Sequence, residues 1–278
     1  MKDYAGTKSV VMNKDLISII DELPLWSAPF GLCLLDKIRI GRNLKVLDIG
    51  CGTGFPLIEI AQRLGDSSQV YGIDPWKDAI NRAQIKIDTY GMNNTVIVQG
   101  FAEKLPFDDE FFDIVVSNNG INNVEDIKKT FAECSRVIKQ NGQFLFTMNL
   151  DSSMMEFYNI LKDELEIEHL KTAVEKLKSH IYEKRRPLNE IKELLNENGF
   201  NLDDISENKF YLRFADGSTL FNHSFIKYWF LSNWHKIVEP EYIDLIFNRV
   251  ERRLNKHAEE SGELKLTVPY AAINCSKL

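Results

Sequence analysis

Short apolar runs alternate with longer amphipathic stretches through the middle of the chain. The runs have the length of buried strands and are bounded by turn residues or charges; they cover residues 46–49, 70–73, 95–98, 114–117 and 143–148. The stretches between them repeat apolar residues with a helical period and close near a glycine, a C-terminal signal of helices; they cover residues 57–64, 76–90 and 124–139. The alternation predicts an α/β fold with a doubly wound, mostly parallel sheet covered by helices on both faces.

The flanking regions add helices and two more strands. Apolar residues with helical spacing occur before the first predicted strand, in residues 14–35, and after the fifth, in residues 154–180. Residues 201–214 and 263–274 have the pattern of strands. Between those two strands lies a long insertion that is rich in aromatic residues and ends in an amphipathic helix.

Three glycines at every second position follow the first predicted strand, so they form a turn at the carboxyl edge of the sheet. Gly50, Gly52 and Gly54 lack Cβ atoms, tolerate positive φ and let a ligand touch the backbone. Asp74 ends the second strand, where a carboxylate can accept hydrogen bonds from both hydroxyls of a ribose. The pattern predicts a ribose-containing cofactor. Phe55 stands where G-x-G-x-x-G needs its third glycine, which argues against a pyridine dinucleotide.

The charge and the cysteine content argue against a nucleic-acid partner, a disulfide framework and a metal site. The net charge of −7 argues against a nucleic-acid partner, because phosphate neutralisation requires clustered Lys and Arg. Lys184, Arg185 and Arg186 form the tightest basic run and, like His180 nearby, are expected on a solvated face. The N-terminus lacks a signal-peptide core, and the longest apolar stretch, residues 28–35, cannot span a bilayer, so we expect a cytoplasmic protein with no membrane partner. Four scattered cysteines indicate neither a disulfide framework nor a metal site.

Four segments of the sequence carry a family resemblance. Asp48 and the three glycines form D-x-G-x-G-x-G, "VYGIDPW" contains Asp74, "GFAEKLPFDDEFFDIVVSNNGINNV" contains the fourth strand, and "FAECSRVIKQNGQFLFT" leads into the fifth. Together they resemble the class I, Rossmann-like S-adenosylmethionine-dependent methyltransferases, in the small-molecule branch similar to ubiquinone biosynthesis enzymes with a methyltransferase type 11 domain. The resemblance covers residues 45–149 and implies a seven-stranded sheet whose last two strands form an antiparallel edge hairpin.

The resemblance also implies which residues bind the cofactor. Asp48 would lie near the ammonium of S-adenosylmethionine, Asp74 would hold the ribose, and Trp76 would flank the adenine. Phe101 replaces an aspartate that is common in the family, so stacking is expected in place of that residue's contact with the adenine amino group. The expected cofactor residues are Asp48, Gly50, Cys51, Gly52, Gly54, Asp74, Pro75, Trp76, Phe101, Ala102, Glu103, Ser117 and Asn118.

The segments outside the matching region are expected to surround the methyl acceptor. The resemblance implies an N-terminal helical lid (residues 1–44) and a helical cap insertion (215–262) over a core of residues 45–214 and 263–278. The acceptor would be a small, largely apolar metabolite with an oxygen, nitrogen or carbon nucleophile; its expected contacts are Trp26, Phe30, Asn119, Asn122, Phe225, Tyr228 and Trp229. The alternative is that Trp26 and Phe30 only pack against the sheet. His223 is the first candidate for a general base, with a core position as the alternative.

Two other functional classes stay open at this point. A short-chain oxidoreductase is suggested by Tyr158 and Lys162 at Y-x-x-x-K spacing, although the glycine pattern argues against it. A non-catalytic cofactor-binding or interaction protein is the second. The acceptor, the atom methylated and the oligomeric state, including a homodimer, are likewise open.

Overall fold

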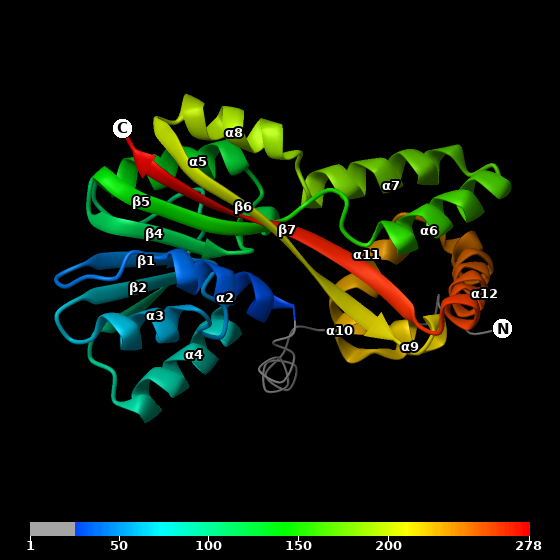
Figure 1. Cartoon of the computed structure of the whole chain (residues 1–278), viewed down its shortest axis with the longest axis horizontal. Helices are drawn as coiled ribbons and strands as arrows, with labels where there is room; N and C mark the ends of the chain where they lie inside the picture. The colour runs from blue at the N-terminus through cyan, green and yellow to red at the C-terminus, as the bar shows by residue number, and fades with distance from the viewer. Residues whose placement is uncertain (1–25) are drawn as a thin grey trace. The chain divides into compact units, whose positions relative to one another are not determined.

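The structure is a computed structural model that describes residues 26–278. These residues form two compact units. The sheet unit comprises residues 26–149, 186–208 and 270–278, and the helical unit comprises residues 150–185 and 209–269 (Figure 1). The expected insertion, residues 215–262, falls in the helical unit, and residues 150–185, which were expected in the core, fall there too.

The sheet has seven strands in the order β3-β2-β1-β4-β5-β7-β6. Their bounds are β1 Lys45–Ile49, β2 Gln69–Asp74, β3 Thr95–Gln99, β4 Phe112–Asn118, β5 Ile138–Asn149, β6 Phe200–Phe214 and β7 Leu264–Lys277. The neighbours from β3 to β5 pair in parallel, whereas β5 and β7 are antiparallel, with Gln143 opposite Ser276 and Asn149 opposite Tyr270. The predicted fold class, a mostly parallel Rossmann-like sheet with an antiparallel edge, is confirmed.

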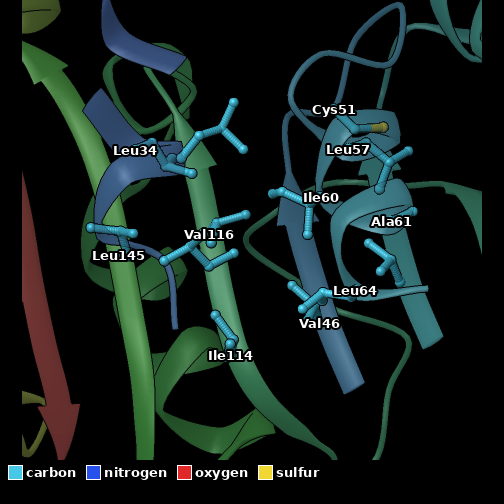
Figure 2. Close-up of a cluster of buried hydrophobic side chains, with 13 residues drawn as sticks. Leu34, Val46, Cys51, Leu57, Ile60, Ala61, Leu64, Ile114, Val116 and Leu145 are labelled. Carbon is cyan, nitrogen blue, oxygen red and sulfur yellow. The ribbon is translucent and has the colours of Figure 1, made fainter. Parts of the chain in front are cut away.

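One face of the sheet is covered by α2 (Ser27–Lys37) and α3 (Leu57–Leu64). Leu34 and Leu35 of α2 are buried with Leu57 and Ile60 of α3 in one apolar cluster (Figure 2). Strand residues complete the cluster; they include Val46, Val70, Ile114, Val116 and Leu145. The described part of the expected lid therefore contains a core helix. Residues 1–25 of that lid lie outside the described residues, and closure over a ligand stays a prediction.

The opposite face is covered by α5 (Ile127–Val137). Side chains alternate between the two faces of a strand, so Phe144 and Phe146 of β5 point away from Leu145. Both rings contact Phe131 of α5, with centroids 5.8 and 5.7 Å away. The carboxylate of Asp126 accepts a hydrogen bond from the Lys129 amide and begins the helix. The helix ends at Val137, and the last residues of the predicted 124–139 stretch already belong to β5.

Two further helices complete the sheet unit. They are α4 (Lys77–Tyr90), which ends at the left-handed Gly91 as its sequence predicts, and α8 (Leu188–Glu197), which follows Pro187. No helix among residues 26–278 is both long enough and apolar enough to cross a membrane.

The helical unit is built from α6 (Met155–Ile167), α7 (Lys171–Lys184), α12 (Ile243–Ser261) and a string of short helices. The short ones are α9 (Gly217–Asn222), α10 (Ser224–Ile226), a π-helical turn (Lys227–Leu231) and α11 (Ser232–His235). Its core is aromatic: Phe157 of α6 stacks on Trp234 of α11 at 4.0 Å, and Phe221 contacts Phe247 of α12 at 5.9 Å. These contacts explain why α6 joins the insertion in one unit.

Candidate functional site

The loop after β1 is held in the conformation that its glycines predict. Gly50, Gly52 and Gly54 all have positive φ, of 76°, 51° and 105°. The amides of Gly50 and Cys51 donate to the carbonyl oxygen of Ile73 in β2, at 2.8 and 3.2 Å. A Cβ on Gly54 would lie 2.7 Å from the end of the Ile58 side chain, and the φ of 105° strains any other residue there, whereas a Cβ on Gly52 would meet open space. The backbone at Gly52 is therefore the part of the loop that a ligand can approach.

Asp74, at the end of β2, fastens this loop. One carboxylate oxygen accepts from the Gly52 amide at 2.9 Å, and the other accepts from the Trp76 amide at 2.8 Å. Burial raises the pKa of Asp74, and the two backbone hydrogen bonds oppose the increase. Each carboxylate oxygen can accept a further hydrogen bond, so Asp74 can support the loop and receive ribose hydroxyls together.

Asp48, on β1 below the same loop, is a fully buried carboxyl group. Neither of its oxygens has a hydrogen-bond partner of good geometry within residues 26–278. Burial, reinforced by the charge of Asp74 and only partly offset by the Leu57 amide, raises the pKa of Asp48 to about 8. A cationic group placed beside it would reverse the effect and stabilise the carboxylate.

The expected adenine side is made by the ends of β2 and β3. Phe101 is 62% exposed, Trp76 is half-buried, and the Pro75 carbonyl accepts from Gln99 Nε2 at 3.1 Å. Ala102 is buried. The Glu103 carboxylate accepts from the Glu125 amide at 2.7 Å and so fixes the segment before α5. This bond uses Oε1 alone, so a contact of Glu103 with an adenine edge stays a prediction.

The end of β4 is held by side chains that were expected to face the cofactor or acceptor. Ser117 is fully buried, and its hydroxyl donates to the Ile49 carbonyl oxygen at 2.8 Å, which ties β4 to β1. Asn118 donates to the Ser27 carbonyl oxygen at 3.2 Å and accepts from the Thr147 hydroxyl at 3.0 Å. Asn119 has a φ of 56° and Asn122 donates to Asn149 Oδ1. These four residues position the backbone of the turn.

Two packing glycines near the site were not singled out from the sequence. A Cβ on Gly120 would lie 2.6 Å from Ser117 Oγ and 2.9 Å from the Ile49 carbonyl oxygen, so the turn after β4 approaches the β1 loop closely. A Cβ on Gly31 of α2 would lie 2.2 Å from Cε1 of Phe55. The signal for Gly120 was its position two residues after the end of a buried strand.

The expected acceptor residues divide between the two units. In the sheet unit, Phe30 is fully buried, with its ring centroid 4.8 Å from that of Tyr270 in β7, and the Trp26 ring lies 5.6 Å from it. Phe30 thus packs against the sheet, and a contact of Phe30 or Trp26 with the acceptor stays a prediction. In the helical unit, Phe225 is buried against Phe230, while Tyr228 and Trp229 are half-buried. A common acceptor pocket stays a prediction.

His223 precedes α10 and packs its ring against Phe214 at 5.4 Å. Its Nδ1 is buried without a hydrogen-bond partner within the described residues. The structure gives His223 an aromatic environment, and its role as a base stays a prediction.

The short-chain oxidoreductase interpretation is wrong. Tyr158 is 1% exposed and accepts a hydrogen bond from Trp234 Nε1, while Lys162 Nζ lies 3.5 Å from Glu166 on the surface of α6. The hydroxyl and the lysine therefore have different partners and do not form one catalytic pair. Residues 26–278 contain no group of three His, Cys, Asp or Glu side chains placed to hold a metal ion.

Comparison with known families gives one extended match. A family model described as a methyltransferase domain matches residues 40–199. The chain is 31% identical over 120 residues to a demethylmenaquinone methyltransferase of Bacillus pumilus, which covers 43% of this chain and 51% of the relative. It is also 33% identical over 141 residues to a probable cobalt-precorrin-6B C(15)-methyltransferase (decarboxylating) of Saccharolobus solfataricus; the match covers 50% of this chain and 67% of the relative. The chain spans about half the length of the demethylmenaquinone methyltransferases that it matches.

Solved structures share the fold over most of the chain. The YcgJ protein from Bacillus subtilis has a TM-score of 0.59 at 20% identity, covering 89% of this chain and 97% of that chain. A geranyl diphosphate C-methyltransferase from Streptomyces coelicolor has a TM-score of 0.57 at 16% identity; the match covers 100% of this chain and 88% of that chain.

Proposed function

Because the chain belongs to the methyltransferase domain family, whose model matches residues 40–199, we propose that it transfers a methyl group from S-adenosylmethionine to a small, largely apolar metabolite. The family match confirms the resemblance predicted from the sequence motifs. The observation that carries the proposal is the orphaned Asp48 carboxyl group below a glycine loop whose backbone is open at Gly52.

The residues of the sheet unit fit this cofactor in charge and in hydrogen bonding. The Asp48 carboxyl has no hydrogen-bond partner among the residues that the structure describes, and burial disfavours its ionised form. The positive charge of an ammonium group beside it would stabilise the carboxylate, so the residue fits that part of the cofactor. The remaining acceptor capacity of Asp74 matches the two hydroxyls of a ribose. The exposed ring of Phe101 and the half-buried Trp76 offer apolar faces for an adenine.

When bound, S-adenosylmethionine supplies a methyl carbon that is activated by a positively charged sulfur. The protein then has to align an acceptor with that carbon and to exclude water, and alignment alone contributes roughly 7–11 kcal/mol. The hydrogen bonds of Ser117 to Ile49 and of Asn118 to Ser27 hold the strand ends and α2 together, which provides a rigid frame for alignment.

Two observations support the acceptor class: the side chains in the loops after β1 and β4, at the carboxyl edge of the sheet, and the substrates for which the relatives are named. Within residues 47–54 and 117–123 the titratable side chains are Asp48 and Cys51, both buried. We therefore expect an acceptor whose nucleophile needs no protein base at this edge, attacking through oxygen, nitrogen or carbon. The relatives are named for demethylmenaquinone and cobalt-precorrin-6B, which are small molecules. A cytoplasmic location and the absence of nucleic-acid partners stay predictions from the sequence.

A labelled-methyl screen tests the proposal. The purified chain is incubated with S-adenosylmethionine carrying a radioactive methyl group and with metabolite extracts separated by polarity. We expect label in a small, organic-soluble product, and less label with the Asp74→Ala variant when S-adenosylmethionine is not saturating. Label confined to nucleic acid or protein fractions, or no transfer with any extract, would contradict the proposed acceptor class.

A further inference from the structure

Three side chains, those of Trp234, Arg185 and His180, meet inside the helical unit around the hydroxyl of Tyr158. This hydroxyl accepts from Trp234 Nε1 at 3.1 Å and from Arg185 Nη1 at 3.3 Å, and it lies 3.4 Å from His180 Nε2. Since the hydroxyl has one proton to give, the arrangement directs it to His180 Nε2. Burial, assisted by the charges of Arg185 and Lys184, lowers the pKa of His180 to about 4, so the ring is neutral at pH 7 and can accept that proton. His180 is therefore not the solvated residue that the sequence predicted.

Among the side chains around the Tyr158 hydroxyl, Arg185 carries a positive charge that no carboxylate of the described residues neutralises. It is 3% exposed, which corrects the expectation of a solvated basic run, and within the described residues no carboxylate bonds to it. On α6, the helix that carries Tyr158, Asp163 and Glu164 accept hydrogen bonds from Arg253 at 2.8 and 3.2 Å. A buried cation that lacks a counter-charge is unfavourable unless something else supplies one.

The unused part of the guanidinium has a defined shape. Nη1 is bonded to Tyr158, which leaves Nε and Nη2 as free donors. Nε is buried without a partner, whereas Nη2 makes no hydrogen bond to the described residues and is not fully shielded from solvent. These two nitrogens lie on one edge of the planar group and together match two oxygens of a carboxylate or a phosphate.

We propose that the helical unit binds an oxyanion, the carboxylate or phosphate group of a small molecule, on the Nε and Nη2 edge of Arg185. Tyr158 holds the guanidinium through Nη1 and through its ring, whose centroid is 5.2 Å from Cζ. Trp234 and His180 in turn fix the Tyr158 hydroxyl, so the edge is oriented before a ligand arrives. The site lies within the helical unit and does not depend on the proposed methyl transfer.

The full-length chain, without cofactor, is titrated with sodium benzoate in one series and with inorganic phosphate in another, against sodium chloride at equal ionic strength. The Nε–H signal of Arg185 in ¹H–¹⁵N spectra is followed, and it is assigned by its loss in Arg185→Lys. We expect this signal to shift in a saturable manner with at least one of the two probes and not with chloride. The probe that acts tells whether the site prefers a carboxylate or a phosphate.

Affinity measured by thermal stabilisation supplies the second readout. Arg185→Lys, which cannot form the two parallel hydrogen bonds, should weaken binding by about tenfold or more, and Arg185→Met should abolish it. Lys184→Met removes one positive charge from the adjacent exposed position and serves as the matched control; its affinity should equal that of the unmodified chain. An Arg185 Nε–H signal that neither probe moves, or an unchanged affinity in Arg185→Met, would overturn the proposal.

Discussion

Replacing Asp48 with Asn is expected to stabilise the ligand-free protein and to weaken its cofactor site. The folded state raises the pKa of Asp48 from 3.8 to about 8, so it binds the proton more tightly than the unfolded chain does. The unmodified protein therefore loses stability as the pH rises from about 4 to about 8. Each pH unit corresponds to about 1.4 kcal/mol, which gives an upper bound of about 4 kcal/mol at pH 7 for the destabilisation that Asn removes.

The assay is urea unfolding of both proteins between pH 5 and pH 9 in steps of about one unit. The stability difference in favour of Asp48→Asn should grow with pH up to about 8 and then level off. At position 48 the described part of the chain offers no hydrogen-bond partner to the carboxyl oxygens, and an Asn side chain would meet the same surroundings. The pH-dependent part of the difference in unfolding free energy therefore measures the cost of the Asp48 charge. Asp66→Asn, which changes an exposed carboxylate in the same unit, is the control and should show no such trend.

Cofactor affinity should move in the opposite direction. If the Asp48 carboxylate balances a bound cation, Asp48→Asn loses a charge-assisted contact of roughly 1.5–3 kcal/mol, which is about tenfold or more in Kd. A variant that is less stable than the parent at pH 8 would show that the buried Asp48 charge does not destabilise the fold, and one with unchanged S-adenosylmethionine affinity would show that Asp48 does not contact the cofactor.

Three further substitutions test the site and its support. Asp74→Ala removes the partner of the Gly52 and Trp76 amides, so calorimetry should show S-adenosylmethionine affinity lowered by about tenfold or more; an unchanged Kd would remove Asp74 from the site. Gly31→Ala should lower stability by about 1–3 kcal/mol in thermal melts, although Ala favours helices, because its Cβ meets the Phe55 ring; the loss should disappear in a Phe55→Ala background, and persistence there would contradict the steric cause. Phe225→Ala should cost about 3–5 kcal/mol because the ring is buried, with S-adenosylmethionine affinity unchanged in the folded variant; a melting temperature equal to that of the parent would show that the ring is not part of the core.

The predictable part of the fold was encoded by local patterns. Strand and helix periods placed β1 to β5 and the helices between them, and Gly65 and Gly91 ended two helices where expected. Spacing of the glycines and Asp74 located the loop, because its geometry depends on residues within one β-strand, turn and helix. Such features need no knowledge of distant partners.

Contacts with partners far along the chain could not be predicted from local patterns. The Glu103 carboxylate accepts from the Glu125 amide, 22 residues away, and its role at the adenine stays a prediction. The Phe30 ring contacts Tyr270 from the last strand, and its role at the acceptor stays a prediction. Arg185 was grouped with its charged neighbours because local charge density predicts a solvated face, whereas in the structure it is buried and contacts Tyr158, 27 residues away.

Calorimetric titration of the purified chain with S-adenosylmethionine, its demethylated product S-adenosylhomocysteine, NAD and NADP tests whether the glycine loop binds the proposed cofactor. We expect saturable binding of the first two, weakened in both Asp48→Asn and Asp74→Ala, and no binding of either dinucleotide. Binding of a dinucleotide alone, or S-adenosylmethionine binding that neither substitution alters, would show that this loop is not the proposed cofactor site.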